Sequence, residues 1–278
     1  MEAKDGNYKI IFSDLDRFYR ECDEIESTGN KEGTENYDPH YCSWNEQDKQ
    51  DDPGWVGLSR EEILKSKYMY LKGLDQLKEI ESDLNLGGTK RSYKWDEIDG
   101  DDLCYDRYID NLPFLKKRIR VKGDGRGKIV NIHVSIGENC GVSYKKMLYR
   151  SYTVMRVIDY LESLGYRTGV TVYDDVADLG KYNGETVKNL HVEIQIKKPE
   201  EPLVKGLILT CISPWMLRYH LFKFWTAKFK CRYGLGHSVR PEYKETETDI
   251  YFPTGSCLSE QACEDKIKQL AEKFNFNE

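Results

Sequence analysis

The chain has 278 residues, of which 39% are hydrophobic and 12% aromatic, and its formal net charge is −6 at neutral pH. This composition is typical of a globular protein with a buried core and excludes disorder of the whole chain. The acidic balance argues against a protein whose main work is to coat nucleic acid, because neutralising phosphates requires an excess of positive charge.

The chain contains no run that approaches the roughly 18 apolar residues of a membrane helix. Its first residues, MEAKDGNYKI, lack the apolar core of a signal peptide. Eight cysteines are scattered without a C-x-x-C pair, so the sequence contains neither a zinc ribbon nor a redox motif. We therefore expect a soluble, cytoplasmic protein with reduced thiols and no membrane partner.

The first part of the chain predicts a strand, a helix and a long loop. Residues 9–12 are a short apolar run, and Ser13 and Asp14 can cap a helix that continues to about Glu26. The segment 27–53 is polar and poor in aliphatic residues, so we expect a long loop there.

The next region predicts a capped helix and a hairpin. Ser59 and Glu62 match a capping box, and the apolar stripe that follows extends the expected helix to Ile80. Two strand-like runs flank a Gly-Asp-Gly-Arg-Gly turn in the segment 118–136, which predicts a β-hairpin.

The segment 130–173 predicts a strand, a polar glycine-containing loop, a long helix and a second strand. An acidic loop over 174–178 should follow, and then the alternating strand 190–196. The unbroken apolar run from Gly206 favours a strand that is buried on both faces.

The last part repeats this order. Ser213 can cap a helix with Pro214 in its first turn. The run 249–255 predicts a strand, and Ser259 caps a closing helix to about Phe274.

This alternation of strands and helices indicates an α/β fold, in which helices cover both faces of a mixed, mostly parallel sheet. We predict a three-layer α/β/α domain over residues 113–278. Residues 1–112 should form an N-terminal helical and loop extension that packs on this core.

Two arginines lie inside apolar helical stripes. On a helical wheel, Arg150 falls near the stripe of the first α/β helix, and Arg218 shares a face with Leu221 and Trp225. A buried guanidinium requires an anionic or polar partner. Each arginine could pair with an internal carboxylate such as Glu138, Asp174 or Asp175, or it could bind an external anion or an acidic partner protein.

Both arginines follow a predicted strand, at the carboxyl edge of the sheet where open α/β folds bind ligands. The same edge carries Asn139 and Ser143, which we include with Arg150 and Arg218 in a candidate anion or partner site; Ser213 should also lie at this edge. Ser135, Glu138 and Asp174 offer hard oxygen ligands and form a candidate Mg²⁺ site. The alternative is a satisfied polar loop in which Ser143 caps the helix.

The basic residues Lys117, Arg118, Arg120 and Lys122 form a candidate nucleic-acid contact surface on the predicted hairpin. The alternative is a solvated hairpin face that protects an edge strand from aggregation. His133 and His191 alternate with polar residues, which indicates either the more solvent-exposed faces of their strands or a hydrogen-bonded layer under a helix. We find no catalytic motif around either histidine.

The segments 53–74, 130–173 and 213–237 resemble, in this order, a family of uncharacterised proteins encoded by bacteriophages and plasmids. Tyr149-Arg150 matches the aromatic-arginine pair of its middle helix, and Arg218 matches an arginine of its later helix. The order of elements also resembles a von Willebrand factor A-type domain. The segment from Ser135 to Asn139 lacks the leading aspartate of the metal motif of that domain.

The resemblance implies a mobile-element protein in a bacterial host cell, and it implies no reaction. Our leading hypothesis is a non-enzymatic binding module that engages a protein or an anionic group at the carboxyl edge of the sheet. The second hypothesis is an enzyme for a phosphorylated or nucleotide substrate, with Arg150 and Arg218 binding the anion and Glu138 or Asp174 as the base. The third is a nucleic-acid-associated accessory protein.

Overall fold

The computed structural model describes residues 2–28, 52–70, 72–73, 93–98, 102–110, 112–118, 128–231, 237–239, 246 and 248–274. The main body is built on one mixed sheet with the strand order β1-β2-β8-β7-β6-β11, and β9 and β10 also pair with β7. Its strands are β1 (Glu2–Lys4), β2 (Asn7–Phe12), β6 (Ile129–Ser135), β7 (Arg167–Tyr182), β8 (Glu185–Lys197), β9 (Lys230–Cys231), β10 (His237–Ser238) and β11 (Asp249–Phe252).

The sheet combines parallel and antiparallel pairs, so the predicted mixed α/β class is confirmed. The prediction that the sheet is mostly parallel was wrong, because four of its seven described strand pairs are antiparallel. β2 pairs in parallel with β8, and β6 pairs in parallel with both β7 and β11. The long strands β7 and β8 form an antiparallel hairpin at the centre. Asn183 and Gly184 connect them with φ values of 48° and 86°, the left-handed backbone that a two-residue type I′ turn requires.

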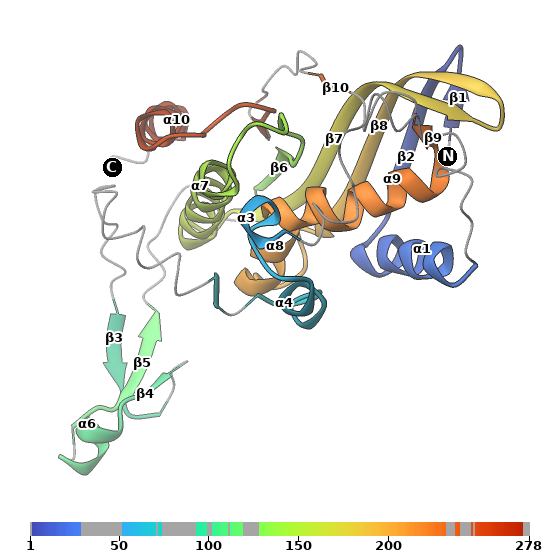
Figure 1. Ribbon diagram of the computed structural model, residues 1–278. Coiled ribbons are helices and arrows are strands. Elements are labelled where there is room, and N and C mark those ends of the chain that lie inside the picture. Colours follow the sequence, from blue (N-terminus) through green and yellow to red (C-terminus); the bar gives the residue numbers. More distant parts are fainter. Residues whose placement is uncertain are drawn as a thin grey trace.

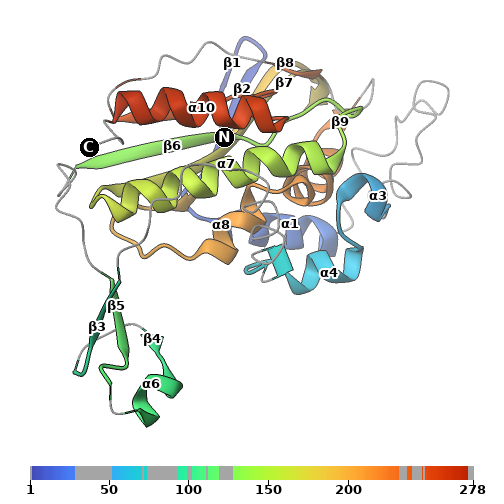
Figure 2. The ribbon, with the colours of Figure 1, turned by 90° about the vertical axis from the view of Figure 1, so that its left-hand side faces the viewer.

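The helices of the main body pack on one face of this sheet (Figure 1). They are α1 (Leu15–Thr28), α3 (Pro53–Val56), α4 (Arg60–Lys65), α7 (Tyr144–Ser163), α8 (Lys205–Cys211), the π-helical turn η1 (Met216–Leu221), α9 (Phe222–Lys228) and α10 (Glu260–Lys273). Phe12 of β2 makes edge-to-face contacts with Phe18 of α1 and Phe224 of α9. At the other end of the sheet, Lys266 of α10 lies over the ring of Phe252. Figure 2 shows α10 and α7 on either side of β6 in projection.

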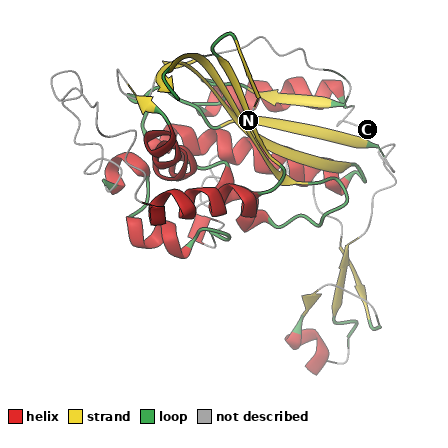
Figure 3. Ribbon diagram, turned by 90° about the vertical axis from the view of Figure 1, so that its right-hand side faces the viewer, coloured by secondary structure: helices red, strands yellow, loops and turns green. Residues whose placement is uncertain are grey.

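The strands explain why one face is covered. On β2, Tyr8, Ile10 and Phe12 are buried, whereas Lys9 and Ile11 between them are not. The same alternation on the other strands gives the sheet one apolar face for the helices and one polar face. Figure 3 shows the strands as one twisted layer with the helices packed against it. Within the described residues, the predicted three-layer arrangement is therefore not confirmed.

The apolar run after Gly206 is a helix, α8, and the prediction of a buried strand was wrong. Five of its seven residues are buried, because α8 packs between α7 and β8. A short run that is apolar on all sides satisfies either period, so the pattern could not separate a buried strand from a buried helix.

The predicted helix after Ser213 is confirmed, since the backbone is helical from Pro214 onward, but Ser213 does not cap it with its side chain. Its hydroxyl donates to the carbonyl of Leu209 in the preceding turn. The chain continues from α8 through the π-helical turn η1 into α9.

The acidic residues 174–178 are not a loop, because they lie inside β7. Their pairing with β8 continues to Tyr182. Acidic residues are depleted in strands, but the long hairpin supplies enough cross-strand hydrogen bonds to include them.

The predicted hairpin over 118–136 does not form either, since its two strands belong to different sheets. β5 (Leu115–Arg118) pairs with β3 (Tyr93–Asp96) and β4 (Asp102–Leu103), whereas β6 pairs with β7 and β11. Only Arg118 of the first predicted strand is described; the rest of that strand and the expected turn, residues 119–127, lie outside the described residues. The small sheet and α6 (Tyr105–Ile109) stand apart from the main body in Figure 2.

The N-terminal region differs from the prediction in two respects. The capping box of Ser59 and Glu62 is present, but α4 ends at Lys65; Leu74, Leu77 and Ile80 lie outside the described residues. β2 is a strand of the main sheet, and α1 contributes to the same core. The boundary predicted at residue 112 therefore separates segments that share one core. In the described part of the chain, no helix is long and apolar enough to cross a lipid bilayer.

Candidate functional site

The loop of residues 136–143, here called the rim loop, joins the carboxyl end of β6 to α7. Ser143 is the N-cap of α7 and accepts a hydrogen bond from the amide of Lys146, as predicted. Asn139 accepts from the amide of Gly141 within the loop. These two candidate residues therefore have local structural partners.

Arg150 is buried, with 1% of its surface exposed, and it contacts the rim loop from α7. Its guanidinium donates to Glu138 Oε2 at 3.2 Å and to the carbonyl of Gly137 at 3.4 Å. Glu138 Oε2 also accepts from the amide of Gly255 at 2.9 Å. Burial lowers the pKa of Arg150, and the charge of Glu138 opposes this shift. The alternative of an internal carboxylate partner is thus the one observed for Arg150.

Arg218 is equally buried and reaches the other end of the rim loop. It donates to the carbonyls of Trp55 and Val142, and its guanidinium lies 4.6 Å from the centre of the Trp55 ring. Burial lowers the pKa of Arg218 to about 10, so the side chain stays charged at neutral pH. The two arginines therefore converge on one loop, and both donate to atoms of the protein itself.

Asp174 lies on the helix-facing side of β7 and is 1% exposed. Neither of its carboxylate oxygens has a hydrogen-bond partner among the described residues. Burial raises the pKa of Asp174 to about 8, and the negative charge of Asp175 adds to this shift. Asp174 is therefore mostly protonated at neutral pH.

The predicted Mg²⁺ ligands do not fit a metal. The hydroxyl of Ser135 is 2.7 Å from that of Thr254, and Glu138 is engaged by Arg150 and Gly255. Within the part of the chain that the structure describes, no group of three or more His, Cys, Asp or Glu side chains could hold a metal ion. We therefore derive no chemistry from a metal at this position.

The candidate nucleic-acid residues are only partly described. Lys117 and Arg118 lie in β5 of the small sheet, and Lys117 is directly opposite Lys94. Arg120 and Lys122 lie outside the described residues. None of these residues is part of the rim loop.

The polar side of the main sheet, here called the open face, brings together side chains from five strands. It consists of Lys9, Asn131, His133, Thr171, Tyr173, Asp175, His191, Glu193, Gln195, Asp249 and Tyr251. The prediction that His133 and His191 lie on the more solvent-exposed faces of their strands is confirmed, because both side chains are partly exposed on the open face.

His133 and Tyr251 stack on adjacent strands of the open face, with ring centres 4.6 Å apart. His133 Nε2 is 3.3 Å from Asp249 Oδ1. This pair gives the end of the sheet near β11 a flat aromatic surface with a carboxylate beside it.

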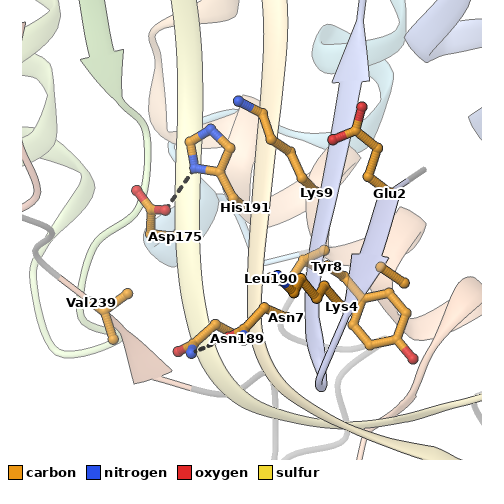
Figure 4. A pocket seen from close by; sticks show the side chains of 11 residues that line it. Glu2, Lys4, Asn7, Tyr8, Lys9, Asp175, Asn189, Leu190, His191 and Val239 are labelled. Carbon is orange, nitrogen blue, oxygen red and sulfur yellow. Dashed lines mark hydrogen bonds and ion pairs between the residues drawn. The ribbon is translucent and has the colours of Figure 1, made fainter.

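A trough of about 590 Å³ lies at the opposite end of the open face (Figure 4). Strand register places Asp175, His191, Lys9 and Glu2 in one row across β7, β8, β2 and β1. Asn189, Asn7 and Lys4 form the next row. Val239 lines the side next to β7.

His191 is the centre of the trough's hydrogen-bond network. Its Nδ1 is 2.7 Å from Asp175 Oδ1, and its Nε2 is 2.8 Å from Glu193 Oε1. Glu193 is also 3.5 Å from Lys9 Nζ. Burial alone would lower the pKa of His191, but the hydrogen bonds and charges of the two carboxylates raise it to about 9. At neutral pH His191 is therefore a cation with both ring N–H groups donating.

Sequence reasoning did not identify the trough. The alternation of His191, Glu193 and Gln195 showed that this strand has a polar face, but Asp175 was assigned to a loop. Because the pairing of β2 with β8 joins distant parts of the chain, no local pattern could place Lys9 beside His191.

A family model described as "Domain of unknown function (DUF7192)" matches residues 2–278. The comparison with curated proteins found no match. The comparison with solved structures found none either.

Proposed function

Because the chain belongs to the DUF7192 family, whose function is unknown, we propose a function from its own geometry: it is a binding module that holds a polar protein segment of balanced charge in the trough. The observation that carries this proposal is the registered row of charged side chains on a sheet face that the described helices leave uncovered.

The charges in the trough decide the class of ligand. Lys4, Lys9 and the His191 imidazolium are balanced by Glu2, Asp175 and the adjacent Glu193. A polyanion such as nucleic acid would meet the carboxylates as well as the cations, and like charges brought together oppose binding. A protein segment with ammonium, carboxylate and peptide groups matches this balance of charge.

The amides of Asn7 and Asn189 supply neutral hydrogen-bonding groups next to this row. Asn189 Nδ2 donates to Asn7 Oδ1 at 2.7 Å, which fixes the orientation of both side chains. Oriented amides suit the N–H and C=O groups of a peptide backbone.

The rim loop and the two arginines that contact it receive less support as a site for an external anion. Arg150 and Arg218 are both buried, and both already donate to internal oxygens. The hypothesis of an enzyme for a nucleotide substrate needs the same two cations, so it loses support for the same reason.

The origin in a bacteriophage or plasmid, the location in the cytoplasm of a bacterial host and the likeness to a von Willebrand factor A-type domain stay predictions. The parallel strands β6 and β11, with a polar loop leading into α7, support that likeness in part. An experimental structure with a second helical layer on the open face would support the three-layer arrangement, and one with a bare open face would contradict it.

The proposal can be tested by selecting binders for the full chain from a library of random short peptides. We expect peptides that carry both acidic and basic residues. His191→Gln should weaken their binding about tenfold or more, measured by fluorescence anisotropy. Binding to the wild type should also weaken as the pH rises past about 9, because the imidazolium then loses its proton.

Lys145→Ala, an exposed change on α7, is the matched control and should bind like the wild type. A single-stranded DNA oligonucleotide serves as the polyanion probe. Salt-sensitive DNA binding without peptide binding would favour the nucleic-acid hypothesis instead. Selected peptides that bind His191→Gln as tightly as the wild type would show that the trough is not the site.

A further inference from the structure

Two buried cysteines lie at the start of α10, close to the rim loop. Cys257 is 3% exposed and lies between β11 and α10, and Cys263 is 0% exposed in the first turns of α10. Both are free thiols. They are separated from the open face by the sheet, so their chemistry is independent of the function proposed above.

Each thiol lies against the backbone at or next to the other cysteine. Cys263 Sγ is 3.8 Å from the carbonyl oxygen of Cys257, and Cys257 Sγ is 3.9 Å from that of Ala262. Cys257 has a φ of 51°, a left-handed conformation that costs a non-glycine residue free energy. This backbone turn directs the chain back toward α10.

The surroundings favour a thiolate in this pair. Ser259 caps α10, so Cys263 lies close to the positive end of the helix dipole. Arg150 and Lys266 act on Cys257 as nearby positive charges. The interaction with Cys257 lowers the pKa of Cys263, although burial opposes this shift, and the same interaction raises the pKa of Cys257, so Cys263 is the thiol that ionises first.

We propose that Cys257 and Cys263 are a reversible dithiol–disulfide site that reacts with a low-molecular-weight disulfide. The Cys263 thiolate attacks one sulfur of the small disulfide and releases one small thiolate, which takes up a proton. Cys257 then loses its proton and attacks Cys263 Sγ, which releases the second small thiol. The protein loses two electrons and two protons, and the small disulfide becomes two thiols.

The bond would fix the segment between β11 and α10, which contacts the rim loop, to the start of α10. Cys257 follows Gly255, whose amide donates to Glu138, and Cys263 Sγ is 3.7 Å from the carbonyl of Tyr149 in α7. A cross-link between 257 and 263 should therefore stiffen the contacts that orient Glu138 and Arg150. Because both sulfurs are buried, the reaction requires local opening at the start of α10 and should take longer than that of an exposed thiol.

The test equilibrates the folded, full-length chain with buffers of oxidised and reduced glutathione, traps free thiols with N-ethylmaleimide and maps the peptides by mass spectrometry. We expect one peptide that contains both 257 and 263, without alkyl groups and two hydrogen masses lighter. Its fraction should follow the ratio of oxidised glutathione to the square of reduced glutathione, and the melting temperature should rise by a few degrees on oxidation.

Cys257→Ser and Cys263→Ser should each abolish this peptide, and Cys257→Ala and Cys263→Ala replace them if a serine variant does not fold. Cys140→Ser, which removes an exposed thiol of the rim loop, is the matched control and should leave the reaction unchanged. The proposal fails if both sulfurs remain alkylated over the whole range of buffers. It also fails if the disulfide appears only in the denatured chain, or if the reaction stops at a mixed disulfide with glutathione.

Discussion

Asp174 and Asp175 are neighbours in β7, yet their side chains meet opposite environments, because successive side chains of a strand point to opposite faces. Asp175 lies on the open face with His191 as its partner. Asp174 points under the helices, where its oxygens have no hydrogen-bond partner among the described residues. One carboxylate thus holds a charge network together, and the other is a proton-binding group in the core.

Asp174 should make the stability of the protein depend on pH. The pKa of this carboxyl is about 8 in the folded chain, against an ordinary value of 3.8 for an aspartate in water. The folded chain then binds the proton more tightly than the unfolded chain, so the free energy of unfolding should fall as the pH rises from about 4 to about 8.

Asp174→Asn should remove this dependence, because asparagine does not ionise. Relative to the wild type, we expect the variant to gain on the order of 2–4 kcal/mol between pH 4 and pH 7. Urea unfolding at several pH values measures it. Asp178→Asn, an exposed change in the same strand, is the control. A stability difference between Asp174→Asn and the wild type that is the same at both pH values would contradict the assignment of Asp174.

The rim loop shows how an element is fitted to its surroundings. Arg150 holds its start and Arg218 its end, and Ser143 fixes the beginning of α7. Gly137 is required at the tightest point, because a Cβ there would overlap Asp174 Oδ1 and lie 3.0 Å from Asp174 Cγ. The loop and β7 therefore constrain each other directly.

Gly137→Ala should destabilise the protein by about 1–3 kcal/mol, because the added methyl group must displace Asp174 or the loop. Thermal or urea unfolding measures the change. Gly141→Ala is the control in the same loop, since its Cβ would be 3.4 Å from the nearest atom and should cost little. If the overlap is the cause, Asp174→Ala should recover part of the loss in the double variant.

At the scale of the whole molecule, Arg218 connects parts of the chain that are far apart in sequence. It comes from η1, next to α9, and donates to Trp55 at the end of α3 and to Val142 in the rim loop. Trp55 in turn donates to the carbonyl of Cys140. This network ties an N-terminal segment to the carboxyl edge of the sheet.

Arg218→Ala should lower the free energy of unfolding by about 2–4 kcal/mol, because it leaves two carbonyl groups without their donor in a buried site. Chemical denaturation measures the loss. Arg218→Lys should recover only part of it, since one ammonium group lacks the planar fork that reaches both carbonyls. If Arg218→Ala is as stable as Lys145→Ala on the exposed side of α7, the network does not hold these segments together.

Local sequence signals predicted where the helices begin, whereas contacts between distant segments could not be predicted in this way. The helices begin where local signals predicted them, at Asp14, Ser59, Ser143 and Ser259, because a cap joins atoms only a few residues apart. The apolar run of β2 and the alternation of β6 and β8 likewise identified these strands. A helix also begins directly after Ser213, at Pro214, although the Ser213 hydroxyl bonds backward to Leu209 instead of capping it.

The sequence by itself therefore determined the local elements, the α/β class and the burial of Arg150 and Arg218. Only the tertiary structure decided that α8 is a helix, that β5 and β6 belong to different sheets and that Asp175, His191 and Lys9 share a trough. The physical reason is that caps and periodic patterns act over a few residues. Strand pairing and the partner of a buried charge depend on free energies between segments that are distant along the chain.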